Sequence, residues 1–131
     1  LLHVNNGVYL SMLDVARVDL MLRSGIAPLL RKHGIYPVVA AQTIRFRRSL
    51  QLFQAFEVET TVIGWDEKAI IIQHHFLRRG ELVADAVVRS RFLRRRGGTV
   101  SSRELLGLVG LTGPSPDLPG WIDAWNRENA R

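Results

Sequence analysis

The sequence predicts a single α+β domain in which an antiparallel sheet wraps around one long central helix. A strongly apolar helical pattern covers residues 8–23, and alternation with a period of two follows over most of residues 39–93. Short turn signals separate the alternating runs, and short connections join antiparallel strands. At 131 residues the chain has room for one hydrophobic core.

The predicted helix is apolar over most of its surface. Its narrow polar side consists of Asp14, Arg17, Asp19 and Arg23. Such a helix is a buried one, with Asn5 or Asn6 as its N-cap and Gly25 as its C-terminal stop. One small sheet cannot cover this helix alone, so the pattern favours a homodimer, and pairing of dimers into a tetramer stays open.

The remaining elements follow in order. A second short helix is expected over 26–34, with Pro28 in its first turn. Strands are expected over 39–49, 56–62, 69–77 and 82–93, and Ser101 with Glu104 forms the capping box of a short helix. We assign residues 1–109 to the domain and 110–131 to an irregular Gly/Pro-rich tail. Trp121 and Trp125 share a face there, so a last helical turn can dock back onto the domain.

Charge and composition limit the partners. The net charge is +6, and the basic residues are almost all arginines, whose forked guanidinium groups bind phosphate and carboxylate. The partner is therefore expected to be anionic, and nucleic acid, an anionic membrane and a phosphate-bearing cofactor all fit. The absence of cysteine suits a reducing compartment, and we expect a cytoplasmic protein. No apolar run reaches membrane-spanning length, although a signal or anchor before Leu1 stays open.

The first residues carry a family resemblance. Segments 3–10 (HVNNGVYL) and 13–17 (LDVAR) resemble the G-H-V-N-N-x-x-Y-L-x-x-x-(D/E)-x-A-R motif of hotdog-fold acyl-CoA thioesterases, in the 4-hydroxybenzoyl-CoA thioesterase-like superfamily. Segments 45–50 and 53–58 resemble the family's second and third strands. The resemblance covers about residues 3–109 and is strongest to the THEM6-like subgroup. It implies a hotdog fold whose N-terminal strand precedes Leu1.

The resemblance also implies a site. Family members form dimers with the acyl-thioester site at the subunit interface, where a carboxylate activates water. The matching carboxylate position falls two residues before Leu1. The backbone N–H of Asn6 matches the helix-start donor that polarises the thioester carbonyl, and a helix start does stabilise negative charge. By the same match, His3 and Tyr9 position the reacting groups, and Asn5 and Gly7 contact the substrate. An asparagine that related plant acyl-carrier-protein thioesterases use is replaced here by Leu1.

Each candidate also has a simpler interpretation. His3 can be an ordinary loop histidine, Asn5 and Asn6 can be helix caps, and Tyr9 can face the core. Asp14 is a reserve candidate for the carboxylate, although an ion pair with Arg17 is the stronger expectation. Three strand residues are candidates for binding the coenzyme A phosphates or, alternatively, for charging a strand edge: Arg45, Arg47 and Arg48.

The chain is therefore predicted to hydrolyse acyl-CoA or acyl-carrier-protein thioesters. His74 and His75 are neighbours on one strand, so their side chains point to opposite faces of the sheet. One of the two is therefore expected to be buried or at an interface, and no metal site is expected. No cofactor is expected beyond coenzyme A as part of the substrate. The main alternative is a non-catalytic hotdog protein that binds acyl thioesters or lipids, which would lack the carboxylate. A basic RNA-binding module is a third alternative, and its binding would weaken steeply with salt.

Overall fold

A computed structural model of the protein describes residues 6–48 and 57–131, with side chains from Met12 onward in the first helix. Its helices are α1 (Asn6–Arg23), α2 (Ile26–Lys32), α3 (Ser102–Leu108) and α4 (Gly120–Asn129). Its strands are β1 (Ile35–Phe46), β2 (Glu57–Trp65), β3 (Ile70–Arg78), β4 (Glu81–Arg94) and β5 (Thr99–Val100). The predicted order of helices and strands is confirmed, with boundaries that shift by a few residues.

The strands form one antiparallel sheet in the order β1-β4-β3-β2, and β5 pairs with the end of β4. β4 pairs with β1, β3 and β5, and alternate residues along it join the apolar clusters on the α1 side of the sheet, as the alternation predicted: Ala84, Ala86, Val88 and Phe92. Within the described part of the chain, β1 and β2 are the two edges. The register shifts in β1 between Val39 and Ala41 and in β2 between Val62 and Gly64, and such bulges bend a sheet.

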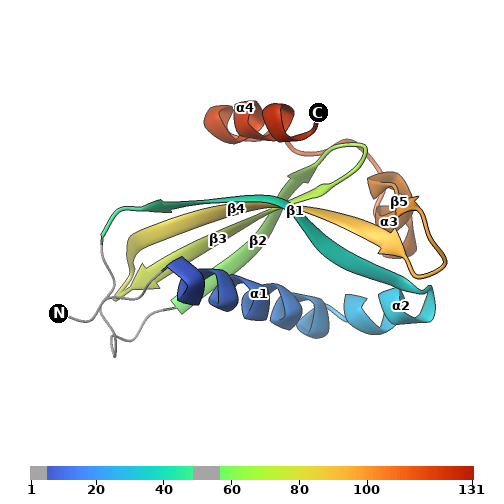
Figure 1. Ribbon diagram of the computed structural model, residues 1–131, viewed down its shortest axis with the longest axis horizontal. Coiled ribbons are helices and arrows are strands. Elements are labelled where there is room, and N and C mark those ends of the chain that lie inside the picture. Colours follow the sequence, from blue (N-terminus) through green and yellow to red (C-terminus); the bar gives the residue numbers. More distant parts are fainter. Residues whose placement is uncertain (1–5, 49–56) are drawn as a thin grey trace.

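The sheet lies between two helices. Figure 1 shows α1 along one face of the curved sheet and α4 on the opposite face. Under the N-terminal half of α1, Leu13 packs against Phe76 and Ala86. A second cluster, further along the same face, joins α2, α3 and the sheet through residues such as Leu30, Val88 and Leu105. This layered α+β arrangement agrees with the predicted fold class.

α1 is less buried than its composition predicted. Leu13 is fully buried, but Val15, Val18 and Leu22 are 69%, 51% and 59% exposed. These three residues are spaced so that they share one face of the helix, and we call them the apolar stripe of α1. The expectation of a helix buried all round is therefore wrong for the single chain, because the sheet covers only one side of α1.

The tail is more ordered than predicted. Where one helical turn was expected, α4 forms ten residues, and Ile122 and Trp125 pack on Ile71 and Val87 of the sheet. Trp121 lies under the guanidinium of Arg45, 3.9 Å from its ring centre. The expected docking is confirmed for Trp125, whereas Trp121 stays partly exposed beside Arg45, and α4 closes the face of the sheet opposite α1.

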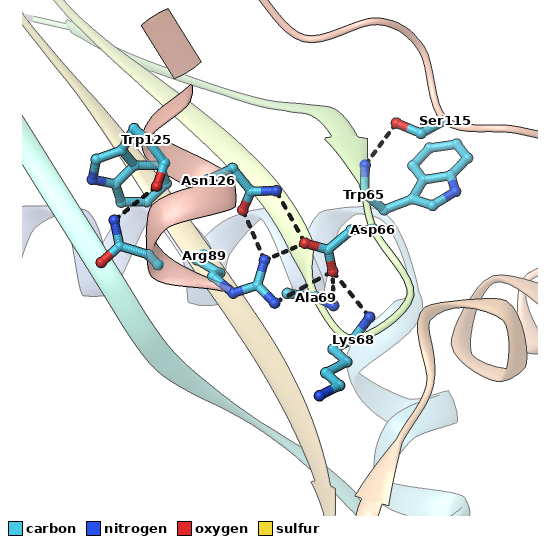
Figure 2. Close-up of polar contacts among 9 residues, drawn as sticks. Trp65, Asp66, Lys68, Ala69, Arg89, Ser115, Trp125 and Asn126 are labelled. Atoms are coloured by element: carbon cyan, nitrogen blue, oxygen red, sulfur yellow. Dashed lines mark hydrogen bonds and ion pairs between the residues drawn. The ribbon is translucent and has the colours of Figure 1, made fainter. Parts of the chain in front are cut away.

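A polar cluster fixes α4 and the β2–β3 turn to the sheet. Figure 2 shows Arg89 of β4 between the carboxylate of Asp66 and the amide oxygen of Asn126, to which it donates at 2.7 Å. Asn126 donates to Asp66 at 3.0 Å, and the backbone N–H groups of Lys68 and Ala69 donate to the same carboxylate at 2.9 Å. Burial alone would raise the pKa of Asp66, but the hydrogen bonds from Arg89 and Asn126 hold it below its usual value.

The segment before α4 crosses β2 closely. Trp65 donates its backbone N–H to the hydroxyl of Ser115 at 2.8 Å (Figure 2). A Cβ at Gly64 would lie 2.7 Å from that hydroxyl and 2.8 Å from a methyl of Leu118. Glycine is therefore needed at this position to let the tail approach the strand.

Candidate functional site

An apolar cavity of about 380 Å³ lies between the C-terminal half of α1 and the sheet. One wall is α1, with Val18 and Met21. The opposite wall is the sheet, and α3 closes the end through Leu105 and Leu106. The sheet contributes Pro37, Val38, Val39, Val62, Trp65, Ile70, Ile72, Ser90 and Phe92. Such a lining suits a hydrocarbon or aromatic group rather than a sugar or a nucleotide.

The charged groups among the described residues of this cavity wall are Asp14 and Arg17. Arg17 is one helical turn after Asp14 and forms an ion pair with it, as the sequence predicted. The Arg17 side chain is buried, whereas the Asp14 side chain is 69% exposed. Burial lowers the pKa of Arg17, and the attraction of Asp14 opposes that effect.

Arg17 also reaches the sheet. Its Nη1 lies 3.4 Å from Nε2 of His74 on β3, and Nδ1 of His74 lies 3.0 Å from the hydroxyl of Thr60 on β2. Because a guanidinium only donates, Nε2 of His74 accepts, and the ring proton on Nδ1 points to Thr60. Burial, the charge of Arg17 and His75 lower the pKa of His74 to about 4, so the imidazole is neutral at pH 7.

Asp14, Arg17, His74 and Thr60 therefore form one chain of contacts from the surface of α1 to the inner face of the sheet. The sequence singled out Asp14 and Arg17, and it predicted that one of the two neighbouring histidines would be buried. His74 is that residue. Thr60 was missed, although it lies two residues from Val58 and Val62 and so shares the side of β2 that is turned toward α1.

The other predicted site residues lie elsewhere. His3 and Asn5 lie outside the described residues. Asn6, Gly7 and Tyr9 are in the first turn of α1, where the helix leaves its first N–H groups without helical partners. α1 begins at Asn6, which is consistent with the predicted match of its backbone N–H to a helix-start donor. The roles of the five residues named in this paragraph stay predictions.

The three candidate phosphate-binding arginines are not in the cavity wall. Arg45 forms an ion pair with buried Asp85 at 2.8 Å and stacks on Trp121, on the α4 side of the sheet. Arg48 pairs with Glu81 at 2.6 Å, and Arg47 is exposed at the end of β1. Their role in binding phosphate stays a prediction, and Arg45 already has two structural partners. Among the described residues no group of three metal-ligating side chains occurs.

Comparison with known proteins identifies the family. The profile of the family described as "Thioesterase-like superfamily" matches residues 1–126. The chain belongs to the thioesterase-like superfamily. The predicted resemblance to hotdog thioesterases is confirmed.

Individual proteins to which the chain is similar agree with this assignment. The chain is 32% identical to Protein THEM6 of Xenopus laevis over 98% of the present chain, and 35% identical to Protein THEM6 of Danio rerio over 92% of the present chain. It spans only 61% and 60% of those two proteins. The crystal structure of the probable thioesterase YbaW from Escherichia coli superposes with a TM-score of 0.74 at 25% identity, over 82% of this chain and 84% of that one.

Proposed function

We propose that the protein hydrolyses acyl thioesters, with the acyl group held in the cavity between α1 and the sheet. The observation that carries the proposal is this apolar cavity in a chain of the thioesterase-like superfamily. The acyl carrier is coenzyme A or an acyl carrier protein, and no cofactor is required. Cytoplasmic location stays part of the proposal. None of the described helices has both the length and the hydrophobicity that crossing a membrane requires.

The start of α1 supplies the electrophilic assistance in this proposal. Unpaired N–H groups and the positive end of the helix dipole stabilise the oxyanion that forms when water attacks the thioester carbon. A carboxylate takes the proton from that water, and the oxyanion then collapses with cleavage of the C–S bond, so that the carrier leaves as a thiolate and takes up this proton. The expected position of the carboxylate is two residues before Leu1, and Asp14 at the cavity wall is the second candidate. His3 and Tyr9 position the reacting groups.

A homodimer completes the site in this proposal. Asn6 lies eight residues before Asp14, where the part of α1 that lines the cavity begins, and this is about 12 Å along a helix. The start of α1 is therefore far from the cavity of its own chain. A twofold axis through the edge strand β2 would reverse the direction of the partner's α1 and bring its start toward the cavity. The apolar stripe of α1 and the exposed Val62 on β2 supply apolar surface for this contact.

The test is hydrolysis of a panel of acyl-CoAs and acyl-carrier-protein thioesters by the full-length protein. His3→Ala is expected to lower kcat about 100-fold, a typical loss for a group that assists proton transfer. Asp14→Asn separates the two carboxylate candidates, since a comparable loss would favour Asp14. An unchanged rate for His3→Ala would remove the role given to His3. Binding without turnover of any thioester would replace hydrolysis by the non-catalytic alternative.

A further inference from the structure

The wall of the apolar cavity contains a buried charge that is incompletely balanced. Arg17 is only 8% exposed and contributes to an otherwise largely apolar lining. Moving a guanidinium out of water costs several kcal/mol unless partners replace the lost hydration. A residue of this kind at a cavity therefore needs an explanation beyond hydrophobic packing.

The partners of Arg17 do not neutralise it fully. Asp14 is the one carboxylate that pairs with it among the described residues, and its exposed side chain is well solvated, which weakens the attraction. His74 accepts a long hydrogen bond of 3.4 Å and carries no charge at pH 7. Thr60 holds the imidazole from its far side and is neutral as well.

These contacts do fix the guanidinium in place. Asp14 on α1 accepts from Nη2 of the guanidinium, and His74 on β3 accepts from Nη1. Thr60 on β2 fixes the imidazole of His74 from its other side. Arg17 has five N–H donors, and the described residues accept from two of its nitrogen atoms. A preorganised donor beside an apolar cavity matches a ligand with an apolar body and an acceptor oxygen.

We propose that Arg17 determines substrate specificity by binding an oxygen substituent on the acyl group, so that the protein prefers oxygenated acyl thioesters over plain hydrocarbon ones. This inference rests on the proposed function, because it names the acyl class that the same cavity accepts. A carboxylate oxygen and a hydroxyl or keto oxygen share the required acceptor chemistry. The carboxylate adds charge neutralisation to the hydrogen bond.

The experiment uses the full-length protein and matched acyl-CoAs of equal carbon number that carry a terminal methyl group, a hydroxyl group or a carboxylate. In the wild type, kcat/KM is expected to be about tenfold higher for the best oxygenated member than for its hydrocarbon counterpart, as for one hydrogen bond to a charged group. Arg17→Met is expected to bring this ratio close to one. Arg17→Lys keeps the charge without the fork, so it should retain more preference for carboxylate than for hydroxyl.

Arg23→Met is the matched control. Arg23 lies on the same helix and pairs with Asp19 four residues before it, but it is exposed and outside the cavity wall. This variant should keep the wild-type ratio. Equal loss of kcat/KM for all acyl groups in Arg17→Met would overturn the proposal, because it would place Arg17 at the thioester or in the fold. The absence of any preference in the wild type would overturn it as well.

Binding separates this inference from the hydrolysis proposal. Calorimetric titration with non-hydrolysable thioether analogues of the same acyl-CoAs should show tighter binding of the oxygenated members, and Arg17→Met should remove that difference. If no thioester is hydrolysed but this binding difference is found, the hydrolysis proposal fails and the role of Arg17 stands. If Arg17→Met does not fold, as judged by circular dichroism, Arg17→Lys decides: an unchanged hydroxyl preference there would overturn the proposal.

Discussion

His74 makes the stability of the fold depend on pH. Its pKa is lowered to about 4 in the folded protein by burial and by Arg17, whereas an unfolded histidine titrates near 6.5. The unfolded state therefore binds more protons as the pH falls from about 6.5 to 4. The contribution of neutral His74 to the unfolding free energy is fully present above about pH 6.5. Protonation of this one residue in the unfolded state should lower the unfolding free energy by about 3 kcal/mol by pH 4.

Urea unfolding at a series of pH values measures this loss. His74→Gln keeps a polar group in the buried site but cannot titrate, so its unfolding free energy should change less over that range. His33→Gln, at an exposed position after α2, should retain the wild-type slope. Equal slopes for wild type and His74→Gln would show that His74 does not carry this dependence.

Single residues of the site were only partly predictable from the sequence. The pair Asp14 and Arg17 follows from helical spacing, and one buried histidine follows from the alternation of β3. The meeting of Arg17 with His74 joins residues 57 positions apart, and it depends on how α1 crosses the sheet. No local sequence pattern specifies how α1 is oriented on the sheet. The residues of the cavity wall, and the buried charge among them, could therefore be identified only from the structure.

At the scale of elements, α4 should stabilise the domain. Ile122 is fully buried between α4 and the sheet, against Ile71 and Val87. Ile122→Ala should therefore lower the unfolding free energy by about 3 kcal/mol, as for other large-to-small core substitutions. Glu128→Ala on the exposed side of the same helix should cost less than about 0.5 kcal/mol. Urea unfolding measures both variants, and a loss below about 1 kcal/mol for Ile122→Ala would contradict the packing of α4.

The predictability of elements follows the strength of their local signals. α1, α2 and the four long strands have clear periodicity or turn residues, and α3 has the predicted N-cap, since Ser101 accepts from the backbone N–H of Glu104 at 3.1 Å. α4 has a weaker signal because a Gly/Pro-rich segment precedes it. Its stability comes instead from tertiary contacts: the apolar packing of Ile122 and Trp125 and the hydrogen bonds of Asn126.

For the whole molecule, the apolar stripe of α1 is the feature that the single chain leaves unexplained. A helix face with Val15, Val18 and Leu22 exposed is costly in water, and a second copy of the chain would cover it. The prediction is a homodimer in sedimentation velocity, with twice the 14.8 kDa mass of this chain if residues 1–131 are used. Val15→Glu places a charge in the proposed interface without touching the cavity wall, so it should shift the protein toward monomers.

The dimer and the site are coupled in this prediction. If the partner's α1 supplies the helix start to the cavity, the monomers formed by Val15→Glu should lose thioester hydrolysis at protein concentrations where the wild type is dimeric. Raising the concentration of the variant should restore activity in parallel with the dimer fraction. Lys32→Glu, which adds an exposed acidic side chain on α2, should change neither quantity. A wild-type protein that stays monomeric while it hydrolyses thioesters would contradict the shared site and place both the helix start and the acyl group within one chain.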